Sequence, residues 1–227
     1  MPWANKTIVF DLDGTLVDTA PDLHAALSYA FELDGLKAVS LDTIRHAIGH
    51  GARAMIKRSA ELSEIELDEA SVTRLHESFL EYYVAHIADL SRPFDDIETC
   101  LKLCKSRNAR LSVCTNKTQA LAEEVLQALN LTQYFDSIVG ADRASQKKPA
   151  AAHIKEAVDL ADGSLENAIM IGDSSTDGKA AQAAGIPFIF MTYGYADDAI
   201  EQCEILQKLD SADTLTSVLE TWINQAS

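Results

Sequence analysis

Five short apolar runs, separated mostly by segments with helical periodicity, constrain the fold of this chain more than any other feature of its sequence. The first run is continuous and rich in β-prone residues, which is typical of a strand buried on both faces of a sheet. The runs lie at 7–10, 111–114, 137–139, 168–171 and 187–191. Helical patterns lie at 118–129, 150–160 and 178–184. Strands that alternate with helices predict an α/β protein with a doubly wound, mostly parallel sheet.

The segment 18–91 interrupts this alternation, because it contains helical patterns and no strand pattern. Its first helix is expected at 21–33, where Pro21 stands in the first turn and Gly35 follows the end. Further helices are expected at 52–62 and, as one or two elements, within 65–90. An all-helical block between the first strand and the rest of an α/β domain predicts an inserted cap.

The domain boundaries are predicted from the same change of pattern. We expect residues 1–17 and 92–227 to form the α/β core, and residues 18–91 to form the helical cap. The first hinge is expected directly after the first strand and its loop. The second is expected where Arg92 precedes Pro93, because a residue before proline disfavours the helical conformation.

The chain is strongly acidic, with 35 Asp and Glu against 19 Lys and Arg and a formal charge of −16. Such a surface repels nucleic acid and anionic lipid, so neither is expected as a partner. No apolar run approaches the roughly 20 residues of a membrane helix. The N-terminus lacks the apolar core of a secretory signal, so we expect a cytoplasmic protein. Four cysteines fit small buried residues in a reducing compartment, although Cys100 and Cys104 also have the spacing of a two-ligand metal clip.

Polar side chains follow the predicted strands at the points where these strands end. Ligands of parallel sheets bind beyond the carboxyl ends of the strands, so these loops are expected to share one site. The loops are Asp11-Leu12-Asp13-Gly14-Thr15, Thr115-Asn116-Lys117, Lys147-Lys148-Pro149 and Gly172-Asp173-Ser174-Ser175-Thr176-Asp177.

Crowded carboxylates of this kind repel one another, and one of them would normally take up a proton. A divalent cation removes the repulsion, and a set of oxygen ligands suits Mg²⁺. A lysine and a threonine hydroxyl beside the cation suit the oxygens of a phosphoryl group. A carboxylate kept ionised in this way can attack phosphorus, and a second carboxyl two residues later can protonate the leaving oxygen.

The stretch Phe10-Asp11-Leu12-Asp13-Gly14-Thr15-Leu16-Val17-Asp18-Thr19 resembles the signature of the haloacid dehalogenase superfamily of phosphatases. The loops at 115–117, 148–149 and 172–177 are similar to its second, third and fourth motifs. Within the superfamily, the segments 20–23, 183–187 and 192–195 resemble the phosphoglycolate phosphatases. The resemblance extends along the whole chain, and it implies a Rossmann-like core, an inserted helical cap and the cofactor Mg²⁺.

The resemblance also implies roles for individual residues. Asp11 would be the nucleophile and a Mg²⁺ ligand. Asp13 would be the general acid and base, with its backbone carbonyl on the metal. Thr115 and Lys148 would hold phosphoryl oxygens, and Asp173 would ligate Mg²⁺ directly or through water.

Further roles are implied for the neighbours of these residues. Asp177 would orient the metal ligands or Lys148, although an Asp here also suits a helix N-terminus. Asn116 and the backbone amides of Leu12 and Asp13 would complete the phosphate site. Lys147 is an alternative to Lys148 as the working cation. Ala150-Ala151 follow Lys148-Pro149, where the superfamily usually continues Lys-Pro-x-Pro.

In the cap, glycines flank His50 immediately before a predicted helix. Gly51 and Arg53 are similar to a substrate loop of the subfamily, and the basic residues Arg53 and Lys57 lie on one helix face. Gly51 and Arg53 are expected to receive the anionic end of a substrate, unless this turn is only the solvated start of a helix. The six histidines form no metal-ligand spacing. Most are expected to be exposed or half-buried, with only His50 near the proposed site.

The resemblance points to a Mg²⁺-dependent phosphomonoesterase that converts 2-phosphoglycolate to glycolate and phosphate. Inorganic pyrophosphate, a nucleoside monophosphate or a sugar phosphate are alternative substrates. A phosphate-binding or partner-binding protein without catalysis is the alternative from another class. The expected partner is a small anionic phosphate ester, and the expected assembly is a monomer or a homodimer.

Overall fold

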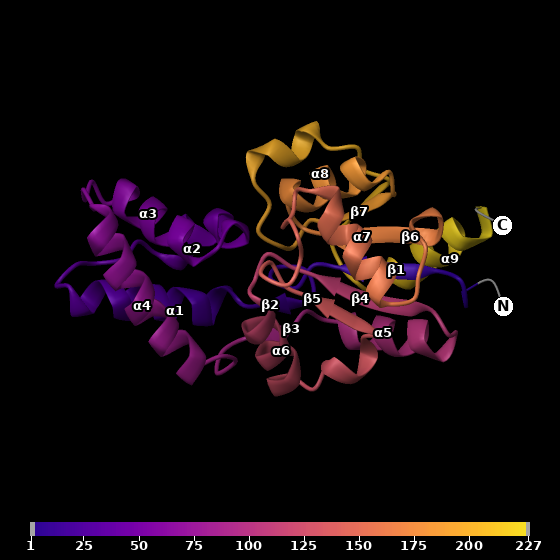
Figure 1. Cartoon of the computed structure of the whole chain (residues 1–227), viewed down its shortest axis with the longest axis horizontal. Coiled ribbons are helices and arrows are strands. Elements are labelled where there is room, and N and C mark those ends of the chain that lie inside the picture. The colour runs from indigo at the N-terminus through magenta and orange to yellow at the C-terminus, as the bar shows by residue number, and fades with distance from the viewer. Residues whose placement is uncertain (1–2, 226–227) are drawn as a thin grey trace.

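The computed structural model describes residues 3–225 and contains a six-stranded sheet beside a separate group of helices (Figure 1). The strands are β1 (Thr7–Phe10), β4 (Arg110–Cys114), β5 (Ser137–Val139), β6 (Ala168–Gly172), β7 (Phe188–Met191) and β8 (Gln207–Leu209). They are all parallel and follow the order β5-β4-β1-β6-β7-β8. The predicted parallel sheet is confirmed. The short edge strand β8 was not predicted.

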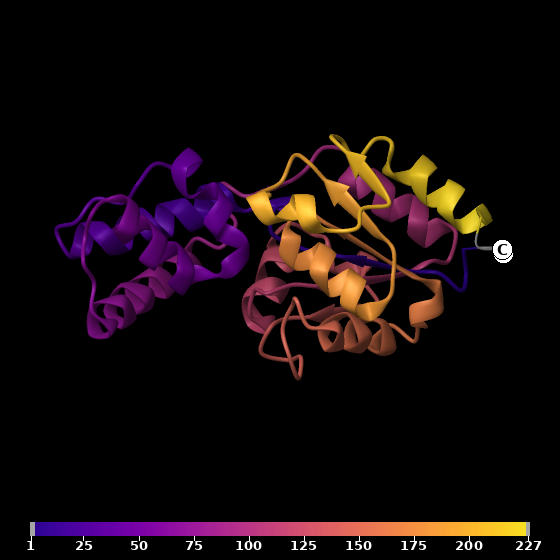
Figure 2. The same cartoon turned by 90° about the horizontal axis from the view of Figure 1, so that it is seen from above.

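Helices cover both faces of this sheet (Figure 2). On one face, alternate strand residues such as Ile8 and Phe10 pack with α5 (Ile97–Ser106), α6 (Gln119–Ala128) and α9 (Leu215–Gln225). On the other face, Val9 packs with α7 (Ala151–Leu160) and α8 (Ser175–Ala184). Successive residues of β1 therefore enter two different cores, which explains why the run is apolar throughout.

Residues 18–91 contain α1 (Ala20–Leu33), the short α2 (Leu41–Ile44), α3 (Ala52–Leu62) and α4 (Glu69–Ala85), with a 3₁₀ turn at Arg45–His50. These helices enclose a hydrophobic core of their own, which includes Phe31, Met55 and Phe79. The segment 65–90 contains one long helix, α4, and this helix begins where the Asp68 side chain accepts a hydrogen bond from the backbone of Ser71. The predicted inserted helical cap is confirmed, while its exact boundaries stay a prediction.

Two short strands connect the cap to the core. β2 (Val17–Asp18) pairs antiparallel with β3 (Arg92–Pro93), so the two chain crossings lie side by side (Figure 1). Among residues 3–225, none of the helices combines the length and the apolar character needed to cross a membrane.

Asp22, in the first turn of α1, holds the chain at the point where it leaves the cap, directly before β3. Its buried carboxylate accepts hydrogen bonds from the N–H groups of Leu90 (3.0 Å) and Ser91 (2.7 Å) and from the Ser91 hydroxyl (2.5 Å). Because an amide at this position offers one acceptor oxygen in place of two, we expect Asp22→Asn to lower the free energy of unfolding by about 1–3 kcal/mol. Urea denaturation measures this. Asp34→Asn, which removes a more exposed ion pair with Arg74, should cost less than about 1 kcal/mol, and equal losses would contradict the argument.

Candidate active site

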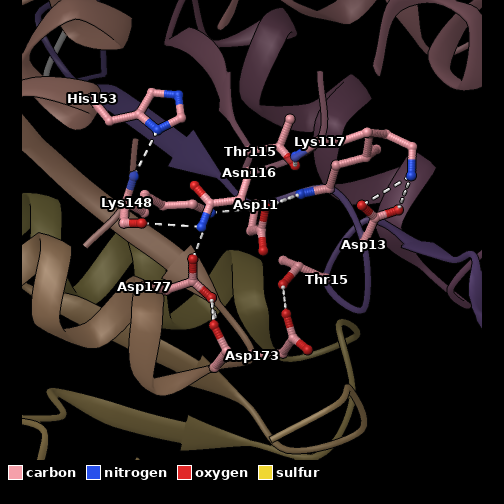
Figure 3. Close-up of polar contacts among 12 residues, drawn as sticks. Asp11, Asp13, Thr15, Thr115, Asn116, Lys117, Lys148, His153, Asp173 and Asp177 are labelled. Atoms are coloured by element: carbon pink, nitrogen blue, oxygen red, sulfur yellow. Dashed lines mark hydrogen bonds and ion pairs between the residues drawn. The ribbon is translucent and has the colours of Figure 1, made fainter. Parts of the chain in front are cut away.

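Three acidic side chains predicted from the sequence meet at the carboxyl edge of the sheet (Figure 3). Asp11 follows β1, Asp173 follows β6, and Asp177 lies in the first turn of α8. One carboxylate oxygen of each lies within 4.8 Å of the others, and all three residues are buried. The approach depends on Gly172, because a Cβ there would lie 2.5 Å from the Asp177 side chain.

Lys148 joins this cluster, and its neighbour Lys147 does not. The Lys148 side chain is 1% exposed, and its Nζ lies 2.9 Å from Asp11 Oδ1 and 2.6 Å from Asp177 Oδ1. Lys147 is exposed at the rim of the adjacent cavity. Of the two lysines considered, the geometry therefore favours Lys148 as the cation beside the carboxylates.

Asp173 is held from two sides by residues far away in the sequence. Its Oδ1 accepts a hydrogen bond from the Thr15 hydroxyl at 2.7 Å, and its Oδ2 accepts one from the backbone N–H of Tyr195 at 2.6 Å. Glycines make the space for this carboxylate. A Cβ at Gly194 would lie 2.3 Å from the Asp173 Cβ, and one at Gly14 would lie 2.3 Å from Oδ2.

Gly194 provides a test of this packing. We expect Gly194→Ala to lower the free energy of unfolding by roughly 1–3 kcal/mol, because the added methyl has to displace Asp173 or its loop. Gly49→Ala is the matched control, since a Cβ there would meet nothing within 4 Å. Urea denaturation of both variants measures the difference, and an unchanged stability of Gly194→Ala would contradict the close contact.

Asp13 stands apart from the other carboxylates and points toward Lys117 (Figure 3). Its Oδ1 lies 2.9 Å and its Oδ2 lies 3.1 Å from Lys117 Nζ, and the Thr19 hydroxyl donates to Oδ1 at 2.6 Å. Lys117 also lies against the cap, because its Nζ stands 4.9 Å from the ring centroid of Tyr83 on α4. The structure therefore does not place the Asp13 carboxylate in the acidic cluster.

The phosphate-binding residues predicted after β4 lie beside Lys148. Thr115 is buried, and its hydroxyl accepts the backbone N–H of Lys117 at 3.1 Å. Asn116 donates from Nδ2 to the Lys148 carbonyl at 3.1 Å, while its buried Oδ1 has no hydrogen-bond partner in the described chain. The backbone N–H of Leu12 donates to Asp11 Oδ1 at 2.7 Å, so the Asp11 side chain occupies this amide.

Burial and mutual repulsion raise the pKa values of the clustered carboxyl groups. Burial, with further contributions from Asp177 and Asp13, raises the pKa of Asp11 from 3.8 to about 7, although Lys148 opposes the shift. Burial, followed by Asp177 and Asp11, raises the pKa of Asp173 well above its ordinary value. Burial alone would lower the pKa of Lys148, but the neighbouring carboxylates outweigh it and raise that pKa.

This donor set fits a divalent cation. Three buried carboxylates with converging oxygens are the ligands that hard cations prefer, and one lysine does not neutralise all of them. A bound cation would relieve the repulsion that raises the pKa values of Asp11 and Asp173.

A cavity of about 440 Å³ lies between the acidic cluster and the cap. Asp11, Asp13 and Thr115 line its core wall, and the predicted cap residues Gly51 and Arg53 line the opposite wall. The structure thus brings Gly51 and Arg53 toward the site.

The guanidinium of Arg53 is already paired in the structure. It lies 2.9 Å from Glu69 Oε2, and Lys57 lies 2.5 Å from Glu69 Oε1. The two basic side chains therefore share one acidic partner on the cap surface. The side chain of His50 is outside the described part of the structure.

Several residues around the site were missed by the sequence analysis. Lys117 and Tyr195 carried no signal beyond their place in motif-like loops. His153 is fully buried and contacts Lys148, so the expectation that only His50 stands near the site was wrong. A possible signal was its position in the first turn of the helix that follows Lys148-Pro149.

Comparison with known proteins agrees with this geometry. The sequence model of the haloacid dehalogenase-like hydrolase family matches residues 8–191. A phosphoglycolate phosphatase from Agrobacterium fabrum is 41% identical over 211 residues, which cover 93% of this chain and 91% of that protein. One from Caulobacter vibrioides is 40% identical over 195 residues, covering 86% and 82%. The crystal structure of a predicted phosphoglycolate phosphatase from Haemophilus somnus has a TM-score of 0.87 and 27% identity, covering 94% and 97%.

The chain therefore belongs to the haloacid dehalogenase-like hydrolases. Within that family it is similar to the phosphoglycolate phosphatases over nearly its whole length. The resemblance inferred from the four motifs is confirmed, and so is the prediction of a phosphoric monoester hydrolase.

Proposed function

We propose that this protein hydrolyses 2-phosphoglycolate to glycolate and inorganic phosphate with Mg²⁺ as cofactor. The observation that carries the proposal is the convergence of Asp11, Asp173 and Asp177 beside Lys148, next to the cavity that Asp11 lines. The relatives named phosphoglycolate phosphatase support the choice of substrate.

Asp11 is the proposed nucleophile. Lys148 and the Leu12 amide both engage its Oδ1, so we assign the attack on phosphorus to Oδ2. The O–P bond that forms gives a phospho-aspartyl intermediate as the bond to the glycolate oxygen breaks. When bound to Asp11, Asp173 and the Asp13 carbonyl, Mg²⁺ would supply positive charge for the phosphoryl oxygens and keep Asp11 ionised.

Lys148, Thr115 and Asn116 hold the phosphoryl group during this transfer. The Lys148 ammonium remains charged because Asp11 and Asp177 raise its pKa. Thr115 and Asn116 both line the cavity. Asp177 acts on Lys148, since it holds the ammonium at 2.6 Å.

Asp13 is the proposed general acid and base. It would protonate the departing glycolate oxygen and then take a proton from the water that attacks the phospho-aspartyl group. In the structure, Lys117 and Thr19 hold its carboxylate, so Asp13 has to exchange these partners for the substrate oxygen. Because Lys117 also contacts Tyr83, we propose that movement of the cap accompanies this exchange.

We further propose that residues 18–91 act as a lid and that Gly51 and Arg53 receive the substrate carboxylate. Arg53 lines the cavity and is bound to Glu69 only at an exposed position, so an anionic group in the cavity can compete for it. The cytoplasmic location and the monomer or homodimer assembly stay predictions.

A phosphate-release assay tests the proposal. The purified protein is given 2-phosphoglycolate, pyrophosphate, a nucleoside monophosphate and a sugar phosphate, each with Mg²⁺ and with a chelator. We expect the highest kcat/KM for 2-phosphoglycolate, and only with the metal. A higher value for another ester would replace the substrate, while phosphate binding without any turnover would replace the enzymatic proposal.

A further inference from the structure

His153 is a buried titratable side chain that the proposed mechanism does not use. Its Nδ1 lies 3.0 Å from the backbone nitrogen of Lys148 (Figure 3). Its Nε2 lies 3.0 Å from the carbonyl oxygen of Val139. A backbone N–H can only donate, so Nδ1 is the unprotonated acceptor and Nε2 carries the hydrogen that Val139 accepts. Burial and the charge of Lys148 lower the pKa of His153 to about 4, which keeps this neutral form at physiological pH.

The carbonyl of Val139 has a second partner. The backbone N–H of Thr115 donates to it at 3.1 Å, at the point where β4 ends beside β5. One imidazole therefore connects, through a single carbonyl oxygen, the backbone of Thr115 to the backbone of Lys148. These two residues come from loops that are more than 30 positions apart in the chain.

The other polar groups of Lys148 are also engaged. Its carbonyl accepts a hydrogen bond from Asn116, and its ammonium binds Asp11 and Asp177. With His153 on the backbone N–H, each polar atom of Lys148 has a defined partner. Among these contacts, only the one from His153 leads back to the end of β5 and from there to Thr115.

We propose that His153 is a positioning residue that sets the distance between Thr115 and Lys148. The inference rests on the proposed function, because these two side chains are there assigned to the phosphoryl oxygens. Hydrogen bonds to a phosphoryl group tolerate little displacement, and a shift of about 1 Å can cost on the order of 100-fold in rate. A residue that bridges the two loops would therefore affect the reaction rate without touching the substrate.

Three substitutions separate the two hydrogen bonds of the ring. His153→Asn keeps an acceptor near the position of Nδ1, His153→Gln keeps a donor near that of Nε2, and His153→Leu keeps neither. We expect His153→Leu to lower kcat/KM for 2-phosphoglycolate by roughly 10–100-fold and to raise the inhibition constant of inorganic phosphate. His153→Asn and His153→Gln each break one of the two contacts, so both should also lose activity and bind phosphate more weakly than the wild type.

The alternative is a purely structural role for a buried histidine. In that case all three variants would melt at lower temperature with the same kcat/KM and the same phosphate inhibition as the wild type, and the proposal would be overturned. His24→Leu is the matched control, since His24 Nε2 lies 2.8 Å from the Val39 carbonyl within the cap. It should lower stability and leave phosphate inhibition unchanged.

The series is also measured with p-nitrophenyl phosphate. If the wild type hydrolyses this ester and not 2-phosphoglycolate, the proposed substrate fails while the inference about His153 is still tested. If Lys148→Met keeps full activity on both esters, the proposed role of Lys148 fails. Wild-type kcat/KM and wild-type phosphate inhibition in His153→Leu, in an enzyme that needs Lys148, overturn the inference alone.

Discussion

Asp11→Asn is expected to lower kcat by on the order of 10⁴-fold or more, and at the same time to stabilise the metal-free protein at pH 8. An amide has no ionised oxygen to attack phosphorus, so the phospho-aspartyl intermediate cannot form. The same change removes a buried charge whose pKa is raised to about 7 by burial and by its acidic neighbours. A gain in stability together with a loss of activity is the signature of a group selected for reaction chemistry.

Two measurements are needed. Phosphate release is measured with Mg²⁺, and thermal unfolding is measured separately with a chelator. Asp142→Asn is the matched control, because this exposed carboxylate accepts a backbone hydrogen bond from Gln119 outside the acidic cluster. It should leave kcat unchanged and should not stabilise the protein. Activity of Asp11→Asn near that of the wild type would exclude Asp11 as the nucleophile.

The convergence of the site could be predicted from the sequence for a physical reason. Parallel strands present their carboxyl ends at one edge, so residues that follow two such strands share a neighbourhood whatever their distance along the chain. Asp11 and Asp173 follow strands that the structure shows as direct neighbours. The apolar runs identified those strands, and the loop composition then identified the edge.

Side-chain orientation was not available from the same pattern. Asp11 and Asp13 are two residues apart in one loop, yet one enters the acidic cluster and the other pairs with Lys117. The difference depends on partners from other loops and from the cap. The contact of Tyr195 with Asp173 is equally non-local, since it depends on the close approach of Gly194 to that carboxylate.

The weakest sequence signal belonged to the edge of the sheet. The strand at Gln207–Leu209 is short, and two of its three residues are exposed, so it has neither an apolar run nor a clear alternation. Its place is determined by pairing with β7.

The start of α8 at Ser175 was predicted three residues late. Its first turn is polar and is stabilised by the reciprocal hydrogen bonds of Ser174 and Asp177.

Removal of the divalent cation is the second change with a large expected effect. With a chelator we expect phosphate release to fall to background and to return when Mg²⁺ is added. The clustered carboxylates would lose the positive charge that keeps Asp11 ionised and that offsets the charge of the phosphoryl group. Asp173→Asn should show the same loss in the presence of Mg²⁺, because it removes one of the proposed ligands.

The effect of Mg²⁺ on stability should depend on pH, and the direction follows from the pKa of Asp11. Its folded-state value of about 7 lies above the ordinary value of 3.8, so the folded protein binds the proton more tightly than the unfolded chain. The proton on Asp11 therefore stabilises the folded, metal-free protein fully below about pH 4. This contribution to the free energy of unfolding is lost as the pH rises through 7. Asp173, whose pKa is also raised by burial, acts in the same direction.

Mg²⁺ requires the ionised carboxylates and therefore competes with protons for the site. At pH 8 the competition is weak, and saturation at 100 times the dissociation constant would add about 2.7 kcal/mol to the free energy of unfolding. At pH 5 the protonated carboxyls bind the ion poorly, so the added stability should be much smaller. Thermal unfolding at the two pH values, with Mg²⁺ and with a chelator, measures both increments. Equal increments at pH 5 and pH 8 would mean that the ion does not bind to the carboxylates of Asp11 and Asp173.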